Sequence, residues 1–248
     1  MRRMGSVNGH KRTLQECDCS LLKPLVSDTM KALVAWSSGK DSAWALHEAR
    51  RSGNFEMVGA LDNGHRAFGR VSMHGIREEL LRAQLEAAGL RAFVLYIPFP
   101  CPNEVYEQKM SATLEDARAF GVTHMVFGDL FLVDVRAYRE RHLAGSGITP
   151  VFPVWGRQTA ALAREMIGSG LEAHLCTVDL KKLPGSFAGR KFDGSLLASL
   201  PAGVDPCGEN GEFHSFVSAG PMFSRDLTIR VGETIERDGF AYADLLLA

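Results

Sequence analysis

The segment between residues 37 and 42 combines small, hydroxyl and charged side chains in a run that could bind phosphate. It reads Ser37-Ser38-Gly39-Lys40-Asp41-Ser42. The apolar run before it, 31–36, predicts a buried strand, and the stretch after it predicts a helix. Serine hydroxyls and the amides at a helix N-terminus donate to phosphate oxygens, and Lys40 would add a mobile positive charge. Asp41 would favour the helix dipole and could hold Mg²⁺.

This run matches one of three phosphate-loop types. A Walker A loop fails because Asp41 follows Lys40 and Val34 stands where the first glycine is needed, and a dinucleotide fingerprint fails because there is one glycine. The pyrophosphatase loop, S-G-G-x-D-S, matches at every position except Ser38. A positive φ there would cost serine about 1 kcal/mol or more, so either φ is negative or phosphate binding is weakened. The competing interpretation is an ordinary strand-to-helix turn with a serine cap.

A second unusual segment, residues 205–216, reads D-P-C-G-E-N-G-E-F-H-S-F. Asn210-Gly211 is typical of a tight turn between strands. Glu209 and Glu212 flank this turn, and in a following strand Glu212 and His214 would share one face. Two carboxylates, an amide and an imidazole could bind an amine, orient Mg²⁺ or act as acid and base. These residue types alone leave a functional site and a plain turn equally open.

Three features together resemble the diphthine–ammonia ligase family, which belongs to the adenine nucleotide α-hydrolase group of pyrophosphatase-loop proteins. They are loop 37–42, the pair Gly128-Asp129 after a predicted strand, and the string Glu209-Asn210-Gly211-Glu212-Phe213-His214. The resemblance runs from about Met30 to about Pro221 and is strongest to bacterial-type members. It implies an ATP-dependent ligase with Mg²⁺, in which a carboxylate attacks the α-phosphorus, PPi leaves, and ammonia displaces AMP from the acyl adenylate.

The resemblance also implies roles for individual residues. The expected catalytic residues are Lys40, Asp41, Asp129, Glu209, Asn210 and Glu212. Of these, Lys40 would stabilise charge, Asp41 and Asp129 would hold Mg²⁺, and the last three would bind the acyl or ammonia side. The expected nucleotide-binding residues are Ser37, Ser38, Gly39, Lys40, Asp41, Ser42, His74 and Gly128. His74 is included because it precedes a predicted helix near the presumed adenine edge.

Strand and helix patterns alternate from Met30 onward, which indicates an α/β protein with a mostly parallel sheet covered on both faces. The predicted strands are 31–36, 56–61, 92–97, 123–128 and 171–178, and the predicted helices span about 72–89, 103–120, 134–143 and 157–169. Asn103 is expected to cap the second of these helices. The resemblance implies a Rossmann-like sheet of five strands in the order 3-2-1-4-5. Ligands bind beyond the carboxyl ends of such strands, where loop 37–42 lies.

Composition divides the chain into three parts. Residues 1–29 are expected to form a disordered tail, so the functional chain could begin at Met30. Residues 30–180 are expected to form the ATP-binding domain. Residues 181–248 are rich in Gly and Pro at first and end in two predicted strands around a turn at 236–239, so they predict a smaller α+β part on the substrate side.

Bulk properties narrow the function classes. The net charge of −1 argues against a nucleic-acid or membrane surface, and no apolar run approaches the roughly 18 residues of a membrane span. Five cysteines without a C-x-x-C pair argue against a zinc site and favour a reducing cytoplasm. Two alternatives remain: a non-catalytic ATP- or AMP-binding regulatory module, and an RNA-thiolating enzyme with Cys207 as nucleophile. The acyl substrate and the oligomeric state do not follow from the sequence.

Overall fold

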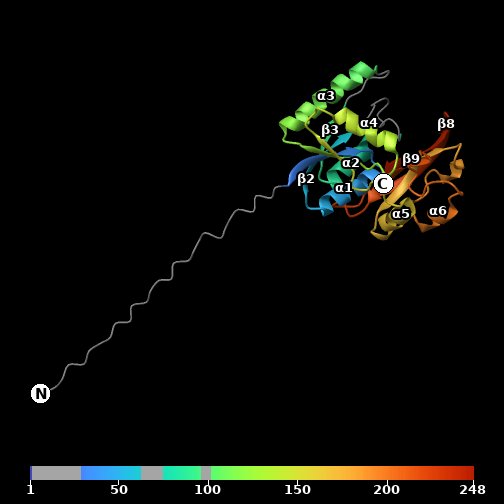
Figure 1. Ribbon diagram of the computed structural model, residues 1–248. Coiled ribbons are helices and arrows are strands. Elements are labelled where there is room, and N and C mark those ends of the chain that lie inside the picture. Colours follow the sequence, from blue (N-terminus) through green and yellow to red (C-terminus); the bar gives the residue numbers. More distant parts are fainter. Residues whose placement is uncertain (2–28, 63–74, 96–101) are drawn as a thin grey trace.

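Two β-sheets organise this computed structural model, which describes Met1 and residues 29–62, 75–95 and 102–248. The first sheet has the order β3-β2-β1-β4-β5, and all its neighbouring strands are parallel. Two of its strands, β2 and β3, are labelled in Figure 1. Its strands are β1 (Met30–Trp36), β2 (Phe55–Asp62), β3 (Arg91–Val94), β4 (His124–Val126) and β5 (Thr149–Val151). The predicted fold class and strand order are therefore confirmed.

One strand assignment was wrong. The fifth parallel strand is β5, which the sequence analysis missed because it has three residues and contains Pro150. The strand predicted at 171–178 exists as β6 (Glu172–Asp179), but it lies in the second sheet. That sheet has the antiparallel order β7-β6-β9-β8, with β7 (Phe213–Ala219), β8 (Ile229–Arg237) and β9 (Phe240–Leu247). The predicted pair of strands at the C-terminal end is confirmed as β8 and β9.

The helices follow the predicted pattern with shifted ends. They are α1 (Lys40–Arg51), α2 (Glu78–Ala87), α3 (Asn103–Ala119), α4 (Val133–Leu143), α5 (Thr159–Gly168) and α6 (Gly194–Ser199), with a 3₁₀ turn at Gly185–Phe187. Within the described residues α2 begins at Glu78, not earlier. The cap of α3 is Pro102 rather than Asn103, because its φ of −61° and ψ of 146° place it in the extended geometry of a cap. Residues 2–28 of the predicted tail, residues 72–74 and residues 96–97 lie outside the described residues.

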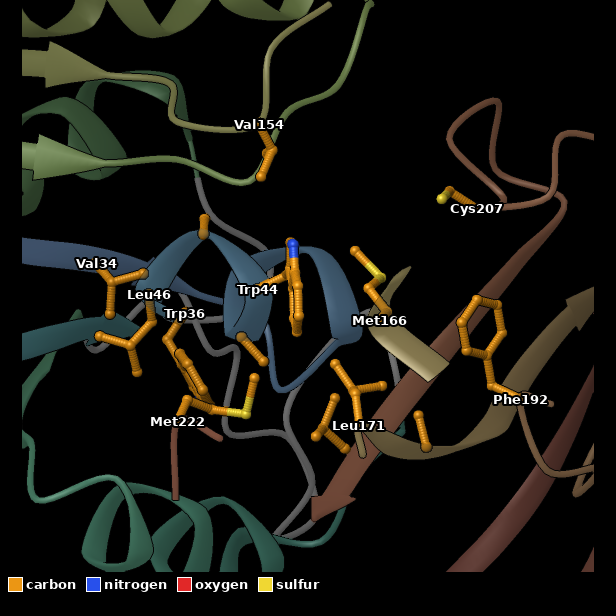
Figure 2. Close-up of a cluster of buried hydrophobic side chains, with 14 of the residues drawn as sticks. Val34, Trp36, Trp44, Leu46, Val154, Met166, Leu171, Phe192, Cys207 and Met222 are labelled. Atoms are coloured by element: carbon orange, nitrogen blue, oxygen red, sulfur yellow. The ribbon is translucent and has the colours of Figure 1, made fainter. Parts of the chain in front are cut away.

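Helix α1 is enclosed between the two sheets. Along β1, Ala32, Val34 and Trp36 face the same core as α1, whereas Leu33 packs in a separate core with residues of α3 and α4. The second sheet adds its own apolar side chains to the α1 side, including Leu175 of β6. Figure 2 shows Trp44 of α1 between Trp36 and Met166. The chain therefore stacks α3 and α4, the parallel sheet, α1, and then the second sheet.

No helix in the described part of the chain combines the length and apolar character needed to cross a membrane.

Candidate active site

The phosphate-loop candidate lies at the carboxyl end of β1, as predicted, since β1 ends at Trp36 and α1 begins at Lys40. Ser38 has a φ of 65°, so the first of the two alternatives for this position, a negative φ, is wrong. Its side chain is 1% exposed, and its Oγ has no hydrogen-bond partner among the described residues. Ser38 therefore adopts a strained conformation, and its hydroxyl is buried without a partner among the described residues.

The other loop serines support the turn itself. Ser37 Oγ lies 3.0 Å from Ser42 Oγ, and Ser42 Oγ donates to the Gly39 carbonyl at 3.0 Å. The backbone N–H of Lys40 donates to Ser215 Oγ of β7 at 3.1 Å. The loop is thus bonded to the second sheet as well as to itself.

Lys40 is fixed rather than mobile, contrary to expectation. Its residue is 2% exposed, and its ammonium donates to Asp41 Oδ2 at 2.8 Å and to the Cys207 carbonyl. The rings of Phe213 and Phe192 lie 5.3 Å and 5.7 Å from Nζ, within cation–π range. Burial by itself lowers the pKa of Lys40, but the Asp41 carboxylate and the other acidic neighbours raise it above its ordinary value. The charge is therefore retained and held where the two motifs meet.

Two of the predicted catalytic residues, Asn210 and Glu212, are hydrogen-bonded within loop 205–212. Glu212, 3% exposed, accepts at Oε1 from the Asp205 N–H and from Asn210 Nδ2, both at 3.1 Å. Asp205 in turn accepts from the N–H groups of Cys207 and Glu209 at 3.1 Å and 2.9 Å. Asn210 itself is exposed. These bonds hold the loop in the shape that presents Glu209 and the Cys207 carbonyl.

Both motifs line one cavity with a volume of about 110 Å³. Its walls are Ser37, Gly39, Lys40, Asp41, Gly208, Glu209, Gly211, Phe213, His214 and Ser215. Strand alternation places Phe213 and Ser215 on the face of β7 that meets loop 37–42. Asp41 and Glu209, predicted from separate segments, are thus brought together by the fold.

Glu209 is the acidic group in this cavity that is best suited to proton transfer. Its Oε1 accepts from the Leu130 N–H at 2.8 Å, which ties the second motif to the segment after β4. Burial raises the pKa of Glu209 to about 7, and the carboxylates of Asp41 and Asp129 add to the rise. A carboxyl group with this pKa can accept or release a proton near neutral pH.

Gly128 lies directly against the start of α1, and Asp129 follows it in the chain. A Cβ at Gly128 would lie 2.6 Å from the Asp41 carbonyl carbon and 2.8 Å from the Ser42 nitrogen, so a larger residue could not pack here. Asp129 Oδ2 forms an ion pair with Arg139 Nε at 3.6 Å, a distance too long for a hydrogen bond. Burial raises the pKa of the Asp129 carboxyl.

The donor set is compatible with Mg²⁺ held partly by a nucleotide. The described residues contain no group of three or more His, Cys, Asp or Glu side chains in a metal-binding arrangement. However, Asp41 Oδ1 and Asp129 Oδ2 are both buried without a hydrogen-bond partner among those residues. Mg²⁺ characteristically takes one or two carboxylates and completes its shell with phosphates and water, so this pair fits.

Several contacts were not predicted. The sequence analysis placed Phe213 and Ser215 on one strand face but did not connect that face with Lys40, and Phe192 and the Leu130 N–H gave no signal at all. His74 lies outside the described residues. The carbonyl of Cys207 accepts a hydrogen bond from Lys40. Its buried thiol donates to the Thr159 carbonyl at 3.4 Å, and burial raises the pKa of this thiol to about 12. A thiol that stays protonated gives no support to sulfur transfer.

Two family models match the chain, one over the range that contains loop 37–42 and the other over the range that contains the second motif. The chain matches the family models for the diphthamide synthase N-terminal domain at residues 30–150 and for the diphthamide synthase C-terminal domain at residues 158–244. Over 101 residues it is 35% identical to diphthine–ammonia ligase of Danio rerio, covering 39% of this chain and 40% of that protein. The same enzymes of Rattus norvegicus and Homo sapiens are 31% and 29% identical over 101 residues, again 39% of this chain and 38% of each relative. These matches therefore span about two fifths of the relatives' length. Taken with both domain matches, they show that the chain belongs to the diphthamide synthase family.

Proposed function

We propose that this protein is an ATP-dependent ligase that adenylates a carboxylate and transfers the acyl group to ammonia. The observation that carries the proposal is the single cavity lined by loop 37–42 and by Glu209 of the second motif. A protein that only bound ATP would need the loop but not an acidic group of raised pKa beside it. Relatives named diphthine–ammonia ligase support the reaction class.

In the first step, a carboxylate oxygen of the substrate bonds to the α-phosphorus as the α–β bridging bond breaks. The products are an acyl adenylate and PPi. Lys40 remains cationic next to the loop and offsets developing negative charge, while Ser37, Gly39 and Ser42 shape the turn that receives the phosphates. Mg²⁺ bound by Asp41 and Asp129 would neutralise phosphate charge.

In the second step, the nitrogen lone pair of ammonia bonds to the acyl carbon and AMP leaves with the electrons of the carbon–oxygen bond. The nitrogen must then lose one proton to become a neutral amide. Glu209 accepts this proton, because its raised pKa matches the operating pH and its Oε1 is oriented by the Leu130 N–H. Asn210 and Glu212 act by bracing loop 205–212, in which Asp205 accepts from the Glu209 N–H. Most of the rate enhancement would come from positioning.

Product analysis tests this proposal. The protein is incubated with [α-³²P]ATP, Mg²⁺ and a cell extract as the source of carboxylate, with and without ammonium, and AMP is separated from ADP. We expect AMP that increases with ammonium and is lost in Lys40→Met, which keeps an unbranched chain between Phe192 and Phe213. Lys191→Met, which removes a surface ion pair with Glu172, is the matched control and should retain AMP formation.

The other outcomes separate the alternatives. ADP as the product would contradict cleavage of the α–β bond and with it the ligase mechanism. Tight ATP binding without turnover in any extract would favour the non-catalytic regulatory module.

A further inference from the structure

Gln84 lies outside both motifs, on α2, yet it is bonded to the phosphate loop. The residue is 0% exposed, and its amide makes three hydrogen bonds. Nε2 donates to the Ser38 carbonyl at 3.1 Å and to the Val217 carbonyl at 2.6 Å, and Oε1 accepts from Trp36 Nε1 at 3.2 Å. Two acceptors on one side and an N–H donor on the other allow only this orientation of the amide.

These bonds control the direction of the Ser38 carbonyl. That oxygen also accepts from the Val217 N–H at 3.1 Å, so two donors from different elements hold it toward α2 and β7. Ser38 has a φ of 65°, which serine rarely adopts unless its surroundings enforce it. The two hydrogen bonds stabilise the peptide orientation that accompanies this positive φ, and they therefore offset the strain at Ser38.

The direction of this carbonyl decides what the loop offers to a ligand. In a planar trans peptide the carbonyl of Ser38 and the N–H of Gly39 point in opposite directions. With the carbonyl held against Gln84, the Gly39 N–H is directed to the other side, where Gly39 lines the cavity and its N–H donates to Ser37 Oγ at 3.4 Å. If the peptide flipped, a carbonyl oxygen would face the phosphates and repel them.

We propose that Gln84 is a positioning residue of the nucleotide site: by holding the Ser38 carbonyl away from the cavity, it keeps loop 37–42 a binding site for phosphate. This inference rests on the proposed function in that it assigns the cavity to a phosphate-bearing nucleotide. Through Gln84, the N-terminal sheet, α2 and the second sheet all support the loop, because Gln84 is bonded to Trp36 of β1, to Val217 of β7 and to Ser38.

The test compares nucleotide binding in Gln84→Met with the full-length wild-type chain. Methionine keeps the volume and removes both donors. We expect ATP and inorganic triphosphate to bind at least tenfold more weakly in calorimetry, while adenosine binds within twofold of wild type. Amide hydrogen exchange of residues 37–42 should become at least tenfold faster, with exchange in α3 and α4 unchanged.

Two further variants make the result decisive. Trp36→Phe removes the N–H that Gln84 Oε1 accepts but leaves the bond to Ser38, so it should lower the melting temperature and leave ATP affinity within twofold. Gln84→Glu keeps the shape with fewer donors and is the alternative if Gln84→Met does not fold; it should weaken ATP binding as well.

Equal weakening of ATP and adenosine in Gln84→Met would overturn the inference, because it would indicate a general structural defect. Unchanged exchange of residues 37–42 would overturn it too. If the wild type bound no ATP, the proposed function would fail, whereas the exchange measurement would still decide whether Gln84 holds the loop.

Discussion

At the scale of single residues, the site depends on groups whose properties differ from those of the same residues in water. Glu209 has a pKa of about 7 because it is buried beside two other carboxylates. Lys40 keeps its charge in a buried position because Asp41, a carbonyl and two aromatic rings surround it. Such perturbed groups in a cavity are typical of catalytic sites. Two consequences can be measured on Glu209.

Replacing Glu209 by Gln should lower kcat for amide formation by about 10² to 10⁴, the usual contribution of a general base. The substitution keeps the oxygen that accepts from Leu130 and removes the titratable group. In the wild type, kcat should rise with pH through about 7 as Glu209 loses its proton. The pH–rate profile of both proteins is the measurement, and a variant with the same rising limb would rule out Glu209 as the base.

The same substitution should stabilise the fold at alkaline pH. The pKa of Glu209 in the folded state, about 7, lies above the ordinary value of 4.5, so ionising this group opposes folding. The penalty is absent below pH 4.5, grows up to about pH 7 and is complete above it. Allowing for partial solvent screening, we expect Glu209→Gln to gain about 1–2 kcal/mol in free energy of unfolding at pH 8 and nothing at pH 4. Urea unfolding at both values provides the check.

At the scale of elements, the phosphate loop is shared between the two sheets. The Lys40 N–H and the Ser38 carbonyl, both from the N-terminal half, pair with Ser215 and Val217 of β7. The second motif therefore continues directly into the strand that supports the first one. The C-terminal sheet is therefore part of the proposed nucleotide site.

Replacing Ser215 by Ala should remove the acceptor of the buried Lys40 N–H and leave that donor unpaired. We expect a loss of about 1–3 kcal/mol in free energy of unfolding. ATP affinity should also fall, because the first turn of α1 loses its attachment to β7. Ser218→Ala on the same strand is the control: its Oγ makes a long bond of 3.4 Å to the Glu172 carbonyl, so it should lose less and bind ATP normally. Equal effects in the two variants would contradict a specific role for Ser215.

At the scale of the whole molecule, α1 is the common core of both sheets. Trp44, Leu46 and Ala49 of α1 belong to one apolar cluster with side chains of β1 and of the second sheet. Figure 2 shows Trp44 and Leu46 near Val34 and Trp36 of β1. Separating the sheets would expose this helix on one side or the other. The described parts of the chain should therefore unfold as one cooperative unit.

Replacing Trp44 by Ala should cost about 3–5 kcal/mol, because a buried aromatic side chain, 1% exposed, would leave a cavity between the two sheets. Urea unfolding followed by circular dichroism and by tryptophan fluorescence should give coincident single transitions in wild type and variant. Val133→Ala, at a position 72% exposed, should change stability by less than about 0.5 kcal/mol. Two separated transitions in the wild type would show that the sheets unfold independently.

The strand order 3-2-1-4-5 was implied by the family resemblance. The sequence itself was sufficient for the alternation of strands and helices that indicates a parallel sheet, for loop 37–42 and for the second motif. Each of these depends on a local pattern: apolar runs, a small-residue turn at a helix start, and carboxylates flanking Asn210-Gly211. Those patterns also indicated Glu209 and Asp41 as acidic groups of the site. Local sequence patterns predict these features because strands, turns and helix starts are formed by residues that are adjacent in the sequence.

Only the tertiary structure decided how these pieces meet. Four properties depend on partners far away in the sequence. They are the sheet that strand 171–178 joins, the burial of Lys40, the hydrogen bonds of Glu212 and the sign of φ at Ser38. Gln84 shows this most directly, since nothing in α2 itself distinguishes it from an ordinary buried position. Strand pairing, burial and peptide orientation are determined by long-range packing and hydrogen bonding, so the spacing of residues along the chain does not predict them.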